Sequence, residues 1–189
     1  NGTRKDLEGL KKKLISVDGL LICTPVYFGN YSSLISNFID YAVGDEEIIA
    51  SLSGKPMAGI AVGAKRNGGQ ETALIYQLMD FINLGMLGVG NDSDTTSQYG
   101  GTVHAGDIGT AANDDYGIKT SMGTGRRLAS VIKQFHHGDV DRMRGKLKVM
   151  FWILKDKHDY ALKQVKQLIS QTSDQFDSQI LVIKGKDVY

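Results

Sequence analysis

The sequence predicts an α/β protein built on a parallel β-sheet, and three observations lead to that prediction. Short apolar runs typical of buried strands are each followed by a polar loop and then by apolar residues at helical spacing. This order of strand, loop and helix occurs twice in succession. The composition, 41% hydrophobic and 23% charged, is that of a globular protein. Because strands that alternate with helices pair in parallel, we expect a sheet with helices on both faces.

The first strand is preceded by a helix and followed by another. Leucines spaced three and four apart predict an amphipathic helix over residues 4–14. The apolar run at 19–23 predicts a buried strand. A helix is predicted over 34–41, where apolar residues again recur at helical spacing.

The second strand is predicted at 57–62, after the chain is punctuated by Gly54, Lys55 and Pro56. A helix face follows over 74–82. A third strand is predicted at 86–89, and a helix at 126–135 closes the repeating pattern. The residues between them, 90–125, are rich in Gly, Thr, Asp and Asn and are predicted as one long loop, which in a compact domain is usually functional.

The chain changes character after residue 135. An apolar run at 149–154 is too short to cross a bilayer and must be covered. A helix is predicted at 160–169 and a strand at 180–183. We therefore expect a main domain over 1–135 and an α/β appendage over 136–189 that serves packing, oligomerisation or shielding of a ligand site.

The loop after the first strand is a candidate binding site. A parallel strand delivers its C-terminal loop to the crevice where α/β sheets bind ligands, and the next helix points its N-terminal amides the same way. Tyr27 and Phe28 offer aromatic surface, and Gly29 allows close approach of the backbone, which suits a flat ring with polar edges. An ordinary strand-to-helix turn is the alternative. The candidate residues are Thr24, Pro25, Val26, Tyr27, Phe28, Gly29 and Asn30.

The loop after the second strand is a second candidate. Gly68 and Gly69 permit unusual backbone angles, so consecutive amides could bind an anion or a carbonyl oxygen beside the positive charge of Arg66. Helix capping by Glu71 and Thr72, with Arg66 in solvent, is the alternative. The candidate residues are Gly63, Ala64, Lys65, Arg66, Asn67, Gly68, Gly69 and Gln70.

Taken together, these segments resemble a known family. The two loops at 24–30 and 66–72, with the segments 37–40 and 54–56 between them, are similar to the NADPH-dependent FMN reductase and iron–sulfur flavoprotein group, which has the flavodoxin-like fold. Three further segments are similar to the related quinone reductases of the tryptophan-repressor-binding-protein type, namely 85–86, 99–102 and 105–106.

The resemblance implies a doubly wound, flavodoxin-like parallel sheet with FMN at its C-terminal edge. Residues 24–30 would lie along the isoalloxazine and ribityl chain, and 63–70 would border the other edge of the ring. Family members pass reducing equivalents between a nicotinamide nucleotide and quinones, flavins, metal ions or iron–sulfur centres. The implied activity is that of an FMN-dependent NAD(P)H oxidoreductase with a small-molecule electron acceptor, assembled as a homodimer or homotetramer. An electron-transfer flavoprotein acting between protein partners and a non-catalytic interaction module remain alternatives.

The sequence departs from the family pattern in three places. Members begin with a strand and a loop that holds the FMN phosphate, and we expect that segment upstream of Asn1, so that two strands and a helix of the sheet are lacking here. Leu84 stands where the quinone reductases commonly have His. Asn37 stands where iron–sulfur flavoproteins usually have Lys, and an iron–sulfur cluster would require cysteines upstream of residue 1.

Composition excludes other classes of function. A net charge of +1 with no basic run does not fit nucleic-acid binding, and no apolar run is long enough for a membrane span. Cys23 is the single cysteine, so no disulfide can form within these residues, which favours a cytoplasmic location. We predict no metal site, since the adjacent His136 and His137 point apart in either a helix or a strand.

Overall fold

The computed structural model describes residues 4–92, 94–95, 97–107, 109–136, 147–154, 159–171, 173 and 176–183. The chain divides into two compact units, Asn1–His136 and His137–Tyr189. The first unit contains α1 (Arg4–Ser16), β1 (Leu20–Pro25), α2 (Ser33–Val43), α3 (Glu46–Leu52), β2 (Pro56–Gly63), α4 (Gln70–Asn83), β3 (Leu87–Gly88), β4 (Gly101–His104), the 3₁₀ helix η1 (Thr110–Asn113) and α5 (Asp115–His136). The second contains β5 (Leu147–Leu154), α6 (Tyr160–Gln171) and β6 (Phe176–Ile183).

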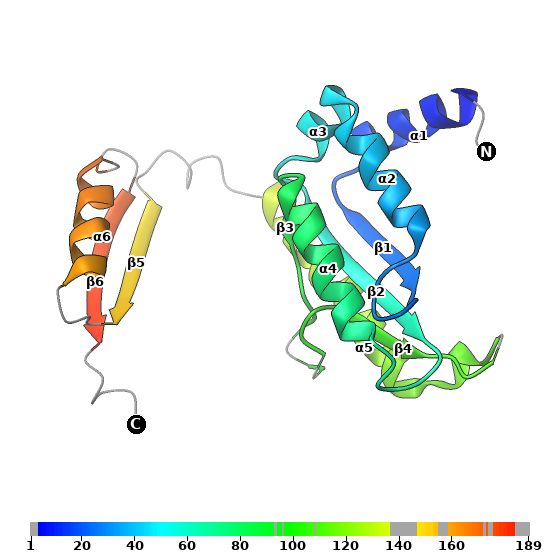
Figure 1. Ribbon diagram of the computed structural model, residues 1–189. Coiled ribbons are helices and arrows are strands. Elements are labelled where there is room, and N and C mark those ends of the chain that lie inside the picture. Colours follow the sequence, from blue (N-terminus) through cyan, green and yellow to red (C-terminus); the bar gives the residue numbers. More distant parts are fainter. Residues whose placement is uncertain are drawn as a thin grey trace. The chain divides into compact units, whose positions relative to one another are not determined.

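The strands of the first unit form a parallel sheet, as predicted (Figure 1). Strand β2 is central and pairs with β1 from Leu20↔Met57 to Pro25↔Val62. Its other edge is shared, because β3 pairs with the start of β2 and β4 pairs with its end. The C-terminal ends of β1, β2 and β4 therefore lie together at one edge of the sheet.

Helices cover both faces of this sheet (Figure 1). One face of β2, which includes Met57 and Ala61, packs against α2, α3 and α4. Ala58 points to the opposite face, as the two-residue period of a strand requires, and packs with Leu128 of α5. Phe81 has no exposed surface, and burial of such a side chain contributes about 1.5–3 kcal/mol to stability.

Strand β1 is covered less completely than the buried strand that the sequence predicts. In the described residues it pairs with β2 alone. Ile22 and Thr24 face the α2 and α4 layer, but Leu21 on the other face is 44% exposed and Cys23 is also exposed. Helix α5 lies mainly against β2 and β4, and it reaches the start of β1 through Ile132, which packs beside Gly19.

The predicted loop over 90–125 is wrong, because it contains β4, η1 and the first half of α5. The sequence signals were weak for physical reasons. Strand β4 has only four residues, and α5 includes Gly117, Gly123 and Gly125, which have low helix propensity. Small residues let α5 lie close to β4, where a Cβ on Gly101 would be 2.9 Å from the Cα of Ser121. Helix α3 was also not predicted, whereas the predicted strands at 19–23 and 57–62 and the helices at 34–41 and 74–82 are confirmed.

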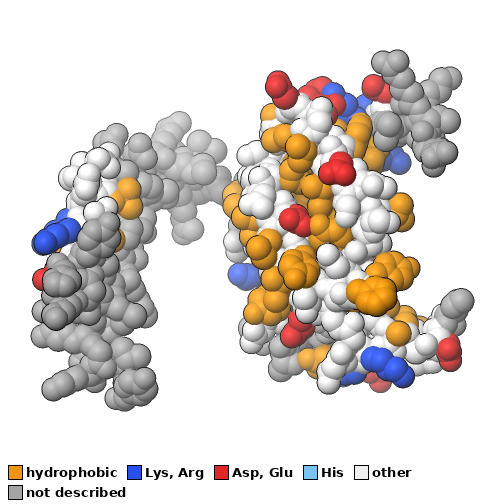
Figure 2. Space-filling model, viewed as in Figure 1, with side chains coloured by type: hydrophobic (Ala, Val, Ile, Leu, Met, Phe, Trp, Pro, Cys, Tyr) orange, Lys and Arg blue, Asp and Glu red, His pale blue; other side chains and the backbone are white. Residues whose placement is uncertain are grey.

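The outer surfaces of α2 and α4 carry exposed hydrophobic side chains. Figure 2 shows these side chains gathered over the two helices on one face of the first unit. Their exposed fractions range from 45% to 76%, far above those of core residues. The residues are Leu34, Val43, Tyr76, Met79 and Ile82.

The second unit is a strand–helix–strand motif. Strands β5 and β6 pair in parallel from Leu147↔Phe176 to Leu154↔Ile183, and α6 connects them. The apolar run at 149–154 is part of β5, and the predicted helix and final strand are confirmed with longer bounds. Among the described helices, none combines the length and the apolar character that a membrane crossing needs.

Candidate functional site

The first candidate loop forms a tight hairpin at the end of β1. Tyr27 and Asn30 exchange backbone hydrogen bonds, with the Tyr27 amide 2.9 Å from the Asn30 oxygen and the Asn30 amide 3.0 Å from the Tyr27 oxygen. Between them, Phe28 has φ 51° and Gly29 has φ 76°, which is the pattern of a type I′ turn. The hairpin holds the Phe28 side chain fully exposed, and Tyr27 is 60% exposed.

The hairpin contacts the second candidate loop through two glycines. Gly69 has φ +91°, and a Cβ placed on it would lie 2.8 Å from the Cα of Gly29. A distance this short excludes any side chain at residue 69 unless the backbone moves. The structure therefore brings together the two loops that the sequence predicts as parts of one site.

Two predicted site residues turn their side chains inward and brace these loops. The Thr24 hydroxyl, 2% exposed, accepts a hydrogen bond from the Ser32 amide and donates to the Pro25 oxygen. The Gln70 side chain, 3% exposed, donates to the oxygens of Lys65 and Val103 and accepts from the Gly68 amide. These bonds fix the shape of the loops and leave the backbone to meet a ligand.

Tyr31 fixes the far end of the first loop. Its hydroxyl donates to the carboxylate of Asp80 on α4. Burial and this hydrogen bond raise the pKa of the Tyr31 phenol to about 12. The loop is thus attached at both ends, by Thr24 and by Tyr31.

The first turn of α4 offers backbone donors beside the hairpin. Its first intrahelical bond runs from the Ala73 amide to the Gly69 oxygen. The amides of Gln70, Glu71 and Thr72 precede that bond and, within the described residues, have no recorded acceptor. Such amides at a helix N-terminus suit a carbonyl oxygen or an anion.

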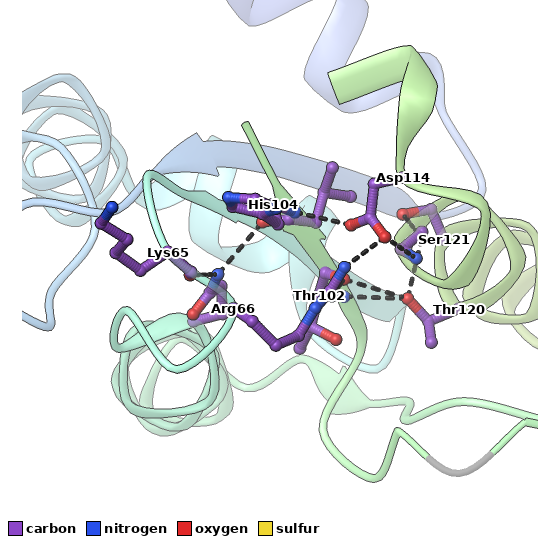
Figure 3. Close-up of polar contacts among 10 residues, drawn as sticks. Lys65, Arg66, Thr102, His104, Asp114, Thr120 and Ser121 are labelled. Carbon is purple, nitrogen blue, oxygen red and sulfur yellow. Dashed lines mark hydrogen bonds and ion pairs between the residues drawn. The ribbon is translucent and has the colours of Figure 1, made fainter. Parts of the chain in front are cut away.

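Arg66 extends from its loop toward β4 and α5 (Figure 3). Its guanidinium donates to the Thr102 oxygen at 3.2 Å, pairs with the carboxylate of Asp114, and lies 5.3 Å from the ring centre of Tyr116. The Arg66 side chain is 40% exposed, so it meets solvent as the sequence alternative expected, but it is also held by these three partners. The positive charge of Arg66 is balanced by Asp114.

Asp114 is the buried acceptor that joins the parts of this network. Its side chain is 7% exposed and accepts from the His104 amide at 2.7 Å and the Gly117 amide at 3.0 Å, which caps the start of α5. Burial works to raise the pKa of Asp114, but the hydrogen bonds from Gly117, His104 and Arg66 outweigh it and hold this pKa below its ordinary value. Asp114 therefore carries its negative charge at neutral pH.

A cavity of about 430 Å³ lies beside this network, within the size range of small-molecule sites. It is bordered by the second loop, the first turn of α4, β4 and α5. Of its lining residues, Arg66, Asn67, Gly69 and Gln70 were predicted, whereas Thr102 and Tyr116 were not assigned to the site. Thr102 and Tyr116 were missed because β4 and the start of α5 were both predicted as loop. The full lining is Arg66, Asn67, Gly69, Gln70, Glu71, Thr72, Thr102 and Tyr116.

The remaining predicted residues lie along the two loops. Val26 continues the β1 ladder through its amide to the Val62 oxygen, and the Asn30 side chain accepts from the Tyr31 amide. Ala64 and Lys65 are exposed in the second loop. No described group of three or more metal-ligating side chains lies close enough to hold a metal ion; His137 of the adjacent histidines lies outside the described residues.

These residues fit the ring of a flavin. Gly29 and Gly69 carry no side chain that would keep a flat group away from the backbone, α4 supplies amides for its polar edge, and Tyr27 and Phe28 supply exposed aromatic surface. The two loops follow the ends of β1 and β2, at the C-terminal edge of the parallel sheet where ligands of such folds bind.

Comparison with known proteins agrees with this arrangement. Residues 1–98 match the family of NADPH-dependent FMN reductases. An iron–sulfur flavoprotein of Methanocaldococcus jannaschii is 37% identical over 128 residues, which cover 68% of this chain and 65% of that protein. An NAD(P)H dehydrogenase (quinone) of Solidesulfovibrio magneticus is 28% identical over 134 residues, which cover 65% of this chain and 66% of that protein. The chain thus spans just under two thirds of the length of these curated relatives.

A solved structure confirms the fold. The crystal structure of a WrbA-like flavodoxin from Agrobacterium tumefaciens has a TM-score of 0.52 and 22% sequence identity, and the match covers 65% of this chain and 71% of that one. The flavodoxin-like parallel sheet predicted from the sequence is therefore confirmed. With its sequence match over 1–98 and this fold, the chain belongs to the NADPH-dependent FMN reductase family.

Proposed function

We propose that this protein is an FMN-dependent NAD(P)H oxidoreductase. The observation that carries the proposal is the contact between the two loops, because Gly29 and Gly69 meet where β1 and β2 end. Membership of the family supports FMN as the cofactor and NAD(P)H as the reductant. When bound, FMN accepts a hydride from the nicotinamide and passes electrons on to a second substrate.

The protein's own residues position the ring. The type I′ hairpin would form one wall, where the backbone of Val26 and Gly29 would approach the ring. The second loop is held in shape by Gln70. This loop and the amides of Gln70 and Glu71 would border the polar edge of the ring. Donors directed at a flavin carbonyl stabilise negative charge on the reduced ring, so these amides would raise its reduction potential.

The proposed electron acceptor is a small aromatic molecule such as a quinone or a free flavin. The relative from Solidesulfovibrio magneticus is named for a quinone, and exposed aromatic rings at Tyr27 and Phe28 would stack on a planar acceptor. The cavity beside the loops has room for part of such a molecule.

An electron-transfer flavoprotein that acts between protein partners is the second candidate. The relative with 37% identity is named an iron–sulfur flavoprotein, which favours this alternative. Cys23 is the single cysteine of this sequence and cannot by itself ligate a cluster, so a cluster would need cysteines outside these residues.

We further propose a homodimer or homotetramer in the cytoplasm. The exposed hydrophobic side chains on α2 and α4, shown in Figure 2, would be covered by a second copy of the chain. We propose that residues 136–189 contribute to this assembly, while a single cysteine favours a reducing compartment.

The test is cofactor binding followed by turnover of the full-length protein. Purified protein should bind FMN, quench its fluorescence, and oxidise NADH or NADPH with menadione or FMN as acceptor. Activity with reduced ferredoxin or another protein donor but not with nicotinamides would support the second candidate. A protein that stays colourless after incubation with FMN would falsify both.

A further inference from the structure

The site contains an Arg–Asp pair whose arrangement suggests a specific task. Arg66 belongs to the second loop, Asp114 immediately precedes α5, and Thr102 lies in β4, so one guanidinium joins three segments (Figure 3). Asp114 in turn accepts hydrogen bonds from the His104 amide at the end of β4 and from the Gly117 amide in α5. The loop is thereby fastened to the far side of the cavity.

The pair is built to hold a position rather than to bind an anion. The Arg66 charge is neutralised by Asp114, and the side chain of Asp114 is 7% exposed whereas that of Arg66 is 40% exposed. A carboxylate that receives two backbone amides is fixed in place, so it is a rigid anchor for the guanidinium. Space is also reserved for it, since a Cβ on Gly117 would lie 2.2 Å from the Asp114 Oδ2.

The anchored loop is the one that meets the hairpin. Gln70 braces the loop from inside, through Lys65 and Gly68, but its link to the rest of the sheet is a single bond to the Val103 oxygen. Arg66 adds the second link, on the outer side of the loop. With both links in place, Gly69 is held against Gly29.

We propose that Asp114 is a positioning residue for the flavin site, acting through Arg66 to hold residues 63–69 against the hairpin at 27–30. This inference rests on the proposed function, because the loop is taken to border the FMN ring. Asp114 does not touch the ring. Its effect is transmitted by the guanidinium.

The experiment is a double-mutant cycle in the full-length protein, using Arg66→Gln, Asp114→Asn and the double variant. FMN affinity is measured by fluorescence quenching of added FMN, and the visible circular dichroism of bound flavin reports the ring's surroundings. We expect each single variant to weaken FMN binding by about tenfold or more, and the double variant to lie within about twofold of the weaker single variant. Arg66→Lys, which can keep the contact to Asp114 but not both contacts, should fall between wild type and Arg66→Gln.

A matched control removes another Arg–Asp pair on the same helix. Arg126 of α5 pairs with Asp92 at 2.7 Å, and neither residue lines the cavity. Arg126→Gln should leave the FMN affinity within about twofold of wild type, because a generic loss of stability does not move the loop. Arg66→Gln also leaves the helix cap at Asp114 intact, so it tests the Arg66–Asp114 pair even if Asp114→Asn folds poorly.

Hydrogen exchange of the loop amides in the FMN-free protein gives a readout that does not depend on the flavin. The Gly68 amide should exchange faster in Arg66→Gln than in wild type. Unchanged affinity and exchange in both single variants would overturn the proposal. So would additive losses, or a loss in Arg66→Gln alone, which would mean that Arg66 contacts the flavin directly. If wild type binds no FMN, the proposed function fails. The exchange measurement still decides whether the Arg66–Asp114 pair orders the loop at 63–69.

Discussion

At the scale of single residues, the most unusual backbone conformation of the site belongs to Phe28. Its φ of 51° lies in the left-handed region, which costs a residue other than glycine or asparagine about 1–2 kcal/mol. This backbone conformation leaves the Phe28 side chain fully exposed. Since strain of this kind persists where function requires it, we interpret Phe28 as a residue that is kept for contact with a ligand.

This interpretation predicts opposite effects of Phe28→Asn on stability and on binding. Asparagine is favoured at the first central position of a type I′ turn, so the free energy of unfolding should rise by about 1 kcal/mol. FMN affinity or the KM for a quinone should worsen, because the aromatic surface is lost. Urea denaturation of the FMN-free protein and fluorescence titration check the two effects.

Tyr27→Asn serves as the control for this change. Tyr27 is also largely exposed but has no positive φ, so the same substitution should bring no gain in stability. If Phe28→Asn destabilises the protein as much as Tyr27→Asn does, the ring makes stabilising contacts and the strain argument fails.

Residue types indicated the two loops, but not the direction of each side chain. Thr24 and Gln70 were predicted as site residues from their position, and the structure turns both inward as braces. Arg66 was expected to place a positive charge beside the two glycines, yet its partner Asp114 lies far along the chain, in the segment that was predicted as one long loop. Contacts between distant segments depend on the packing of β4 and α5, which local sequence patterns do not specify.

At the scale of elements, periodic and apolar segments were predictable, whereas glycine-rich ones were not. Strands β1 and β2 and helices α2 and α4 have clear patterns, and they carry both predicted loops. Strand β4 and the first half of α5 lack such patterns, because Thr120 and Thr124 are fully buried where apolar residues would be expected. The Thr120 hydroxyl accepts a hydrogen bond from the Thr102 amide, so α5 packs on β4 partly through hydrogen bonds rather than apolar contacts alone.

The contact between the two loops predicts that Gly69→Ala disrupts the flavin site. The added methyl group would lie 2.8 Å from the Gly29 Cα, so hairpin and loop must separate. We expect FMN affinity to fall by about tenfold or more, in addition to about 1 kcal/mol of stability lost to the left-handed backbone.

Gly54→Ala isolates the backbone cost from the contact. Gly54 also has a positive φ, +76°, but nothing lies within 4 Å of its added Cβ. This variant should lose similar stability in thermal denaturation and keep its FMN affinity. Equal FMN affinity in the two variants would show that the Gly29 and Gly69 contact is not needed for the site.

At the scale of the whole molecule, the second unit, His137–Tyr189, is not expected to be stable on its own. Two-stranded sheets are marginally stable alone, and parallel sheets are normally covered on both faces. Strands β5 and β6 form such a sheet, and in the described residues α6 is the one helix of that unit. The apolar sequence at 149–154 therefore calls for further cover.

The proposed self-association would supply that cover, and it leads to a prediction about assembly. The full-length protein should run as a dimer or tetramer in size-exclusion chromatography with light scattering. Deletion of 137–189 should lower the number of subunits in the assembly, because the C-terminal sheet is lost from the interface. Met79→Glu on α4 is the comparison, since it places a charge among the exposed hydrophobic side chains of the first unit and leaves the C-terminal unit unchanged. If the deletion keeps the full oligomer while Met79→Glu dissociates it, the subunits associate through α2 and α4, and the C-terminal unit must be covered by some other partner.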